Sequence, residues 1–196
     1  MTTVVGILLG AGSSRRLGRP KQTLPLGGTT LLGHVLRDAE ASSLDRVVLV
    51  LGGAAEAALA AVAPARAEVV VNDAHGSGCA SSLQAGLDAA GPTDAVLLIL
   101  GDMPGVGPEV IDAVRAGWER SRPWGAVTDY RGTPGHPLAF SADAFPALRG
   151  LHGDKAVWKL LDAQPGRFLR VPVDRDLPRD VDTWEDYEAV RGAEEP

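Results

Sequence analysis

Residues 4–21 read VVGILLGAGSSRRLGRPK, and this stretch determines the class of fold that the chain can adopt. Its apolar beginning is typical of a strand that is buried on both faces. Gly10 and Gly12 follow at once, and glycine lets the backbone turn tightly and approach a ligand closely. A buried strand that leads into such a turn predicts an α/β fold with a ligand bound at the end of its first strand.

Similar apolar runs recur along the first half of the chain. Buried strands are expected at 4–9, 47–51, 69–71 and 95–100. Segments with helical spacing lie between them, at 31–41, 54–62, 81–90 and 109–120. Because alternating strands and helices wind into a parallel sheet covered on both faces, we expect an α/β, three-layer, doubly wound, mostly parallel sheet.

The pattern changes after residue 122. Short β-like runs at 125–129, 136–140 and 168–173 are mixed with expected helices near 143–148 and 155–161. No linker is long enough to separate two independent domains. We therefore expect a single domain over 1–196, with a nucleotide-binding half at 1–122 and an acceptor-side half at 123–196.

Composition restricts the class of protein. The 196 residues are 45% apolar and 22% charged, which is ordinary for a soluble globular domain. Cys79 is the only cysteine, which excludes an intrachain disulfide and a zinc site made of several cysteines. A net charge of −6 argues against a general nucleic-acid binder. With no basic segment before the first apolar run and no apolar stretch of ~18 residues, we expect a cytoplasmic protein without a membrane span.

The turn after the first strand is strongly basic. Residues 1–37 contain no acid, whereas Arg15, Arg16, Arg19 and Lys21 surround the glycines. Successive backbone N–H groups, the hydroxyls of the two serines and these cations are suited to phosphate oxygens. The loop lacks the third glycine of the dinucleotide fingerprint and the Gly-Lys-Ser/Thr of a Walker A loop. It is a phosphate loop of a third kind, and the alternative is an exposed basic turn.

The loop resembles the molybdenum cofactor nucleotidyltransferase-like family, within the glycosyltransferase-A-like transferases. The family pattern is Leu-x-Ala-Gly-x-Ser-x-Arg-Met-Gly-x-x-Lys. The matching residues are Leu9, Ala11, Gly12, Ser14, Arg16, Gly18 and Lys21, and Leu17 replaces the methionine. The resemblance implies that a nucleoside triphosphate is bound by Leu9, Gly10, Ala11, Gly12, Ser13, Ser14, Arg16 and Lys21. It also implies that Arg16 and Lys21 contact the phosphates and act in catalysis.

Two acids are candidate ligands of Mg²⁺, the expected cofactor. Asp102 follows the run at 95–100, at the edge where open parallel sheets bind ligands, and it lies in a Gly-Asp-Met-Pro segment that resembles the family's metal motif. The resemblance assigns Asp102 to metal binding, to nucleotide binding and, with Arg16 and Lys21, to catalysis. Asp182 lies in a segment similar to the family's closing Asp-x-Asp-Thr-x-Glu-Asp motif. Asp182 is either a second metal ligand or, with Glu185 after it, the N-cap of the last helix.

Two further segments are similar to the family. The first implies that Asn72, Gly78 and Ser82 lie beside the base and ribose; without the resemblance, its serines are ordinary helix caps. The second, Gly-Thr-Pro-Gly-His-Pro over 132–137, is expected to be a rigid loop in which His136 contacts an acceptor phosphate.

The acceptor end departs from the family at one position. The resemblance assigns acceptor binding to His136, Asp154 and Lys155. Many cofactor cytidylyltransferases continue Gly-Asp-Lys with Gly-Ala-Arg, but Trp158 stands here in place of the arginine. Trp158 either stacks on a flat ring or packs against the sheet.

The resemblance implies Mg²⁺-dependent transfer of a nucleoside monophosphate to a small phosphorylated acceptor, with release of pyrophosphate. CTP and a molybdopterin-type acceptor are favoured, because Ala11 resembles the cytidylyl branch more than the guanylyl one. A molybdoenzyme or its chaperone is the implied protein partner. Three alternatives stay open: another phosphorylated acceptor such as a sugar phosphate, a nicotinamide-dependent oxidoreductase, and a non-catalytic nucleotide-binding assembly factor.

Overall fold

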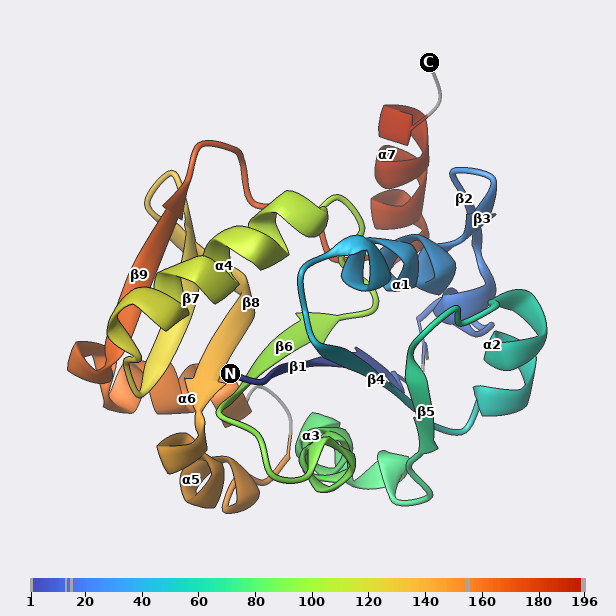
Figure 1. The fold of residues 1–196 in the computed structure, drawn as a ribbon. Helices are drawn as coiled ribbons and strands as arrows, with labels where there is room; N and C mark the ends of the chain where they lie inside the picture. Colours follow the sequence, from blue (N-terminus) through green and yellow to red (C-terminus); the bar gives the residue numbers. More distant parts are fainter. Residues whose placement is uncertain (1, 13, 15, 154–155, 195–196) are drawn as a thin grey trace.

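The computed structural model describes residues 2–12, 14, 16–153 and 156–194. A seven-stranded sheet forms its centre, in the order β5-β4-β1-β6-β8-β7-β9 (Figure 1). The strands are β1 (Val4–Gly10), β4 (Arg46–Leu51), β5 (Glu68–Val71), β6 (Ala95–Leu100), β7 (Gly125–Tyr130), β8 (Thr133–Ser141) and β9 (Phe168–Val173). A two-stranded hairpin, β2 (Pro25–Leu26) and β3 (Thr29–Thr30), stands apart from it.

Helices cover both faces of the sheet, which confirms the expected three-layer α/β fold. The helices are α1 (Leu31–Ala41), α2 (Ala55–Ala61), α3 (Cys79–Ala90), α4 (Pro108–Ser121), α5 (Phe145–Arg149), α6 (Ala156–Ala163) and α7 (Trp184–Glu194). Helices α1, α2 and α4 contribute to one apolar core, and α3, α5 and α6 contribute to the other (Figure 1). Strand β1 supplies both cores, because its successive side chains point to opposite faces.

The sheet is parallel in its first half and mixed in its second. β1 pairs in parallel with β4 and β6, and β4 pairs in parallel with β5. β8 is antiparallel to both β6 and β7, whereas β9 is parallel to β7. One continuous sheet therefore joins residues 1–122 to residues 123–196. The last segment also returns to the first half, where α7 packs on the β2–β3 hairpin through Tyr187 and Val190.

The segment at 132–137 differs from the expected rigid loop. Only Gly132 lies in the turn, at φ 96°, and Thr133 already begins strand β8. The pairing of β7 with β8 shifts register between Val127 and Thr128. Near this shift, the hydroxyl of Thr128 donates to the carbonyl of Pro137 at 2.7 Å, and the hydroxyl of Tyr130 donates to the carbonyl of His136 at 2.6 Å. These side-chain bonds, together with the irregular register, accommodate prolines inside a strand.

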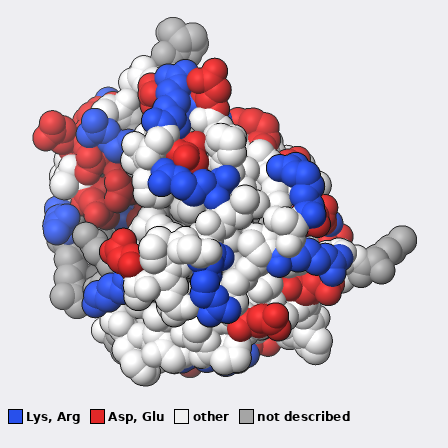
Figure 2. Space-filling model, turned by 90° about the vertical axis from the view of Figure 1, so that its left-hand side faces the viewer, with Lys and Arg blue, Asp and Glu red and all other residues white. Residues whose placement is uncertain are grey.

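The acidic C-terminal segment is partly neutralised by arginines. Figure 2 shows basic and acidic side chains interspersed over the β9 side of the molecule. Arg131 pairs with Asp174 and Asp176, each at 2.9 Å, and Arg179 pairs with Asp186 at 3.1 Å. None of the helices in the described part of the chain has both the length and the apolar character that a membrane span requires.

Candidate functional site

A cavity of about 580 Å³ lies at the carboxyl ends of β1 and β6. Its loop-side wall consists of Ala11, Gly12, Ser14, Arg16, Lys21, Asp102 and Asp182. Its acceptor-side wall consists of Leu98, His136, Leu151, Ala156, Val157 and Trp158. Between the two walls, the start of α3 contributes Gly78 and Ser82. The cavity thus brings together residues that lie as far apart in the sequence as Leu9 and Asp182.

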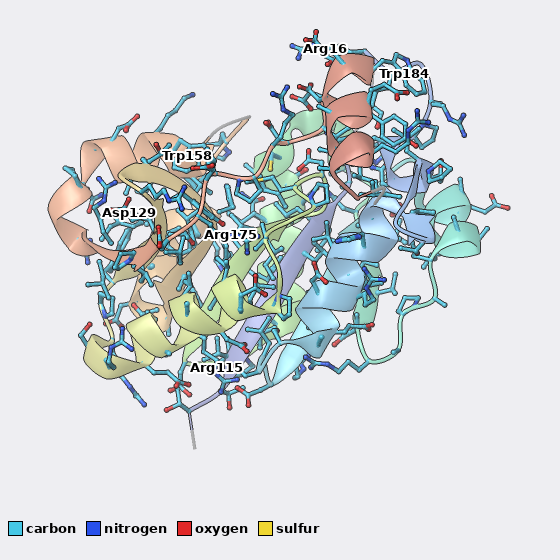
Figure 3. The ribbon with its side chains drawn as sticks, turned by 90° about the horizontal axis from the view of Figure 1, so that it is seen from above. Arg16, Arg115, Asp129, Trp158, Arg175 and Trp184 are labelled. Carbon is cyan, nitrogen blue, oxygen red and sulfur yellow. The ribbon has the colours of Figure 1, made fainter. Side chains whose placement is uncertain are left out.

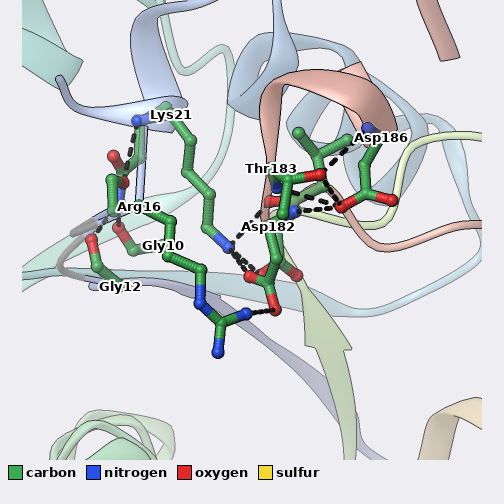
Figure 4. A network of polar contacts seen from close by, with 11 residues as sticks. Gly10, Gly12, Arg16, Lys21, Asp182, Thr183 and Asp186 are labelled. Atoms are coloured by element: carbon green, nitrogen blue, oxygen red, sulfur yellow. Dashed lines mark hydrogen bonds and ion pairs between the residues drawn. The ribbon is translucent and has the colours of Figure 1, made fainter. Parts of the chain in front are cut away.

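Lys21 joins the two predicted metal ligands, and Figure 4 shows its contact with Asp182. Its Nζ lies 2.6 Å from Oδ2 of Asp102 and 2.9 Å from Oδ1 of Asp182, and it also donates to the carbonyl of Val181 at 3.0 Å. An ammonium group has three N–H donors, and these three acceptors use all of them. The two carboxylates therefore converge on a single cationic group.

The charge of Lys21 is maintained although the side chain is buried. Burial alone lowers the pKa of this amine, but the attraction and hydrogen bond of Asp102, followed by those of Asp182, outweigh it. The resulting pKa is raised above the ordinary lysine value. Lys21 is thus a cation at neutral pH.

Gly101 brings Asp102 close to the phosphate loop. Its N–H donates to the carbonyl of Leu9 at 2.9 Å, so the end of β6 lies against the end of β1. A Cβ atom at Gly101 would lie 2.9 Å from that same carbonyl oxygen and 2.8 Å from the Leu32 side chain. Glycine is therefore required where the chain leads from β6 to the carboxylate.

The structure excludes one of the two roles weighed for Asp182. The N-terminus of α7 is capped by Thr183, whose Oγ1 accepts from the backbone N–H of Asp186 at 3.2 Å. The Asp186 carboxylate accepts in return from the N–H of Thr183 at 2.9 Å (Figure 4). This reciprocal pair is a capping box one residue later than expected, so the N-cap interpretation of Asp182 is wrong. The Asp182 side chain is free to bind Lys21.

The phosphate loop is anchored by the short 3₁₀ helix η1 (Lys21–Thr23). The N–H of Lys21 donates to the hydroxyl of Ser14 at 2.9 Å, and Ser14 has a left-handed φ of 50°. Gln22 donates to the carbonyls of Gly10 and Gly12. Gln22 was not identified from the sequence. The available signal was an amide side chain directly after the loop lysine, because an amide can donate two hydrogen bonds to loop carbonyls.

Arg16 is placed at the mouth of the cavity. Its guanidinium lies 3.9 Å from the Asp182 carboxylate, and 74% of its side chain is exposed. In Figure 3, Arg16 lies near α7, whereas Trp158 lies in the other half of the molecule. A long, exposed cation at this position is able to turn toward a bound phosphate, because the single weak pair does little to restrain it.

The predicted base and ribose residues have two kinds of position. Gly78 and Ser82 line the cavity, whereas Asn72 is buried behind them. The Asn72 amide donates to the hydroxyls of Ser81 and Ser82, at 2.9 and 3.0 Å. Asn72 therefore holds the first turn of α3 and reaches the cavity through Ser82.

His75 lines the cavity and was not singled out from the sequence. Its side chain covers Gly52 and Gly53: a Cβ atom at Gly52 would lie 2.8 Å from Cβ of His75, and one at Gly53 would lie 2.6 Å from Nε2 of its ring. Its Nδ1 lies 3.0 Å from the carbonyl of Asn72. The available signal in the sequence was the glycine pair Gly52 and Gly53, directly after a buried strand. Glycines at such a position indicate that another segment approaches the backbone closely.

His136 and Trp158 pack together on the acceptor-side wall. Their rings meet edge to face, with centroids 5.3 Å apart. Burial lowers the pKa of His136 to about 4, so its ring is neutral at pH 7. Nδ1 lies 3.3 Å from the carbonyl of Leu98, which can only accept, so Nδ1 carries the proton. A neutral ring with this tautomer offers no charge to an acceptor phosphate.

Three predicted site residues, Ser13, Asp154 and Lys155, lie outside the described residues. Within the described residues, no three or more His, Cys, Asp and Glu side chains form a group that could hold a metal ion. The metal candidates are therefore a pair of carboxylates. A divalent ion held by such a pair completes its coordination with water and substrate oxygens.

Known proteins resemble this chain over most of its length. Residues 6–168 match the family described as the MobA-like NTP transferase domain. The purine catabolism protein PucB of Bacillus subtilis is 32% identical, over 97% of each chain. Nicotine blue oxidoreductase of Paenarthrobacter nicotinovorans is also 32% identical, over 93% of each chain.

A solved structure shares the fold. Rv0371C of Mycobacterium tuberculosis H37Rv, in complex with manganese, has a TM-score of 0.87 and 37% identity, over 98% of this chain and 100% of that chain. The family match covers more than half of the chain, and it begins at the strand that precedes the phosphate loop. The chain therefore belongs to the MobA-like NTP transferase family and is a nucleotidyltransferase.

Proposed function

We propose that this enzyme transfers a nucleoside monophosphate, CMP from CTP, to the phosphate of a molybdopterin-type acceptor and releases pyrophosphate. The observation that carries the proposal is the convergence of Lys21, Asp102 and Asp182 at the edge of the phosphate loop. This convergence lies in a cavity whose other wall is formed by residues of the second half of the chain, including His136 and Trp158.

The residues fit a divalent metal ion, for which Mg²⁺ is our proposal. Asp102 and Asp182 come from segments 80 residues apart, yet both bind one cationic group, as a carboxylate pair binds a metal. A manganese complex is known for the similar protein Rv0371C. Asp102 and Asp182 would hold the ion, which would supply neutralisation of phosphate charge when bound. Lys21 would then be available to the phosphates.

The reaction needs positioning and charge neutralisation more than covalent help. An acceptor oxygen forms a bond to the α-phosphorus while the bond from the α-phosphorus to the bridging oxygen breaks, and pyrophosphate leaves. Ala11, Gly12, Arg16 and Lys21 line the cavity. The backbone N–H groups of Ala11 and Gly12 and the cationic side chains of Arg16 and Lys21 would stabilise the growing negative charge.

The choice of CTP is supported by Ala11, which resembles the cytidylyl branch. The molybdopterin-type acceptor is supported by the family resemblance, and Trp158 in the acceptor-side wall is suited to a flat ring. The contribution of Asp154 and Lys155 to acceptor binding, and a molybdoenzyme or chaperone partner, stay predictions.

Thermal stabilisation tests the proposal. The protein is heated with Mg²⁺ or Mn²⁺ and each of CTP, GTP, ATP and UTP, and separately with NADH and NADPH. A ligand at 100 times its dissociation constant adds about 2.7 kcal/mol to the free energy of unfolding. We expect a metal-dependent response to CTP above the other triphosphates, followed by single-turnover pyrophosphate release with the acceptor. A response restricted to a nicotinamide cofactor would contradict the proposal.

A further inference from the structure

Gln22 is buried directly behind the phosphate loop, with 4% of its surface exposed. Its Nε2 donates to the carbonyl of Gly10 at 2.8 Å and to the carbonyl of Gly12 at 2.9 Å. Both N–H groups of the amide are thus used on alternate carbonyls of the same loop.

These two bonds fix the direction of a backbone donor. In a trans peptide the C=O and N–H groups point in opposite directions. The carbonyl of Gly10 is directed at Gln22, so the N–H of Ala11, in the same peptide unit, is directed away from it. Ala11 and Gly12 line the cavity, whereas Gln22 lies outside its lining. Gln22 therefore holds the loop from behind while the N–H of Ala11 faces the opposite side.

The amide is retained although it is costly to bury. Oε1 of Gln22 is buried and finds no hydrogen-bond donor among the residues that the structure describes. A buried acceptor without a donor destabilises the folded state, and methionine has nearly the same shape without that penalty. A residue that breaks a local packing rule is expected where function requires it.

We propose that Gln22 is a positioning residue for the triphosphate, which fixes the Ala11 N–H as a phosphate donor by binding the carbonyls on both sides of Ala11. This inference rests on the proposed function, because it assumes that a triphosphate binds the loop. Gln22 acts through the loop backbone and does not itself touch the substrate.

Gln22→Met tests the proposal, because it keeps the side-chain length and removes both donated bonds. We expect the dissociation constant for the triphosphate to rise about tenfold, a loss on the scale of one to two hydrogen bonds. The midpoint of thermal unfolding should also fall, because the carbonyls of Gly10 and Gly12 lose their donor, and removal of the unpaired oxygen offsets this only in part. A purely structural role would lower stability without a selective loss of triphosphate affinity.

Gln84→Met is the matched control. Its Nε2 also donates to two backbone carbonyls, those of Arg149 at 3.0 Å and Leu151 at 3.1 Å, but away from the phosphate loop. Its triphosphate affinity should remain within about twofold of wild type. Equal affinities for Gln22→Met and wild type would overturn the inference, whereas a wild-type protein that binds no triphosphate would contradict the proposed function itself.

A measurement on the unmodified protein keeps the inference testable even if Gln22→Met does not fold. In an amide NMR titration with the triphosphate and Mg²⁺, the backbone N–H resonance of Ala11 should shift strongly. A resonance that does not move while the triphosphate binds would also overturn the inference.

Discussion

The loop-side wall and the acceptor-side wall enclose the same cavity but differ in charge and in polar pairing. On the loop side, Lys21 is a charged amine that Asp102 and Asp182 hold in place. On the acceptor side, His136 is neutral and packs against Trp158. From this difference we expect the two substrates to be recognised by different interactions: charge and backbone donors for the triphosphate, and apolar contact for the acceptor.

The largest effect is expected from Asp102→Asn on the loop-side wall. Loss of this carboxylate removes a proposed metal ligand, and turnover should fall roughly 1,000-fold. Pyrophosphate release at saturating Mg²⁺ measures it. Asp94→Asn is the control, because Asp94 lies before the other end of β6, where it accepts from the N–H of Thr3 at 2.7 Å. If both variants kept wild-type turnover, Asp102 would have no role in the reaction.

Lys21→Ala should lower turnover about 100-fold and weaken triphosphate binding less, since its charge acts mainly in the transition state. It should also strengthen Mn²⁺ binding in the absence of nucleotide, because Lys21 no longer competes for Asp102 and Asp182. Electron paramagnetic resonance of free Mn²⁺ measures the second effect. Lys159→Ala, on an exposed position of α6, serves as the control. Equal losses in binding and turnover would argue against the transition-state role.

The neutral acceptor-side wall makes stability depend on pH. His136 has a folded pKa of about 4 against an ordinary value of 6.5. Between these pH values the unfolded chain binds more protons at this position, so the free energy of unfolding falls as the pH is lowered. The full loss is roughly 3 kcal/mol. Urea unfolding at pH 7 and pH 4.5 measures it.

The variant His136→Gln separates this effect from other titrating groups. It should lose most of the pH dependence, whereas His152→Gln, at an exposed position, should retain it. An unchanged pH dependence in His136→Gln would show that other groups cause it.

The smallest effect is expected from Trp158→Ala on the acceptor-side wall. Loss of its aromatic contact should raise the KM for the acceptor about fivefold, in line with roughly 1 kcal/mol for a ring pair. Triphosphate affinity should not change, because Trp158 lies on the opposite wall from the phosphate loop. Steady-state kinetics with each substrate varied in turn measure both. A loss of triphosphate affinity would mean that the two walls do not act separately.

The helices and the strands of the parallel half of the sheet were predictable from the sequence, because apolar periodicity and flanking glycines act locally. The strand expected at 95–100 and the helix expected at 31–41 coincide with β6 and α1. The loop expected at 132–137 was wrong, because its prolines are accommodated by a register shift and by hydroxyl groups from β7. Such cross-strand bonds are not encoded in the spacing of one segment.

The site was predictable residue by residue but not as an arrangement. Lys21, Asp102 and Asp182 were each identified, yet their shared ion pair depends on α7 returning to the first half of the molecule. The N-cap of α7 is Thr183, paired with Asp186, instead of Asp182 paired with Glu185. Local spacing is the same for both pairs and does not distinguish them.

The sequence by itself determined the α/β class, the basic glycine-rich loop and the acid after β6, because these follow from local polarity and backbone freedom. Only the tertiary structure decided that Asp182 faces Lys21, that His136 is neutral and that Gln22 holds the loop from behind. These features depend on burial and on contacts between segments distant in the sequence.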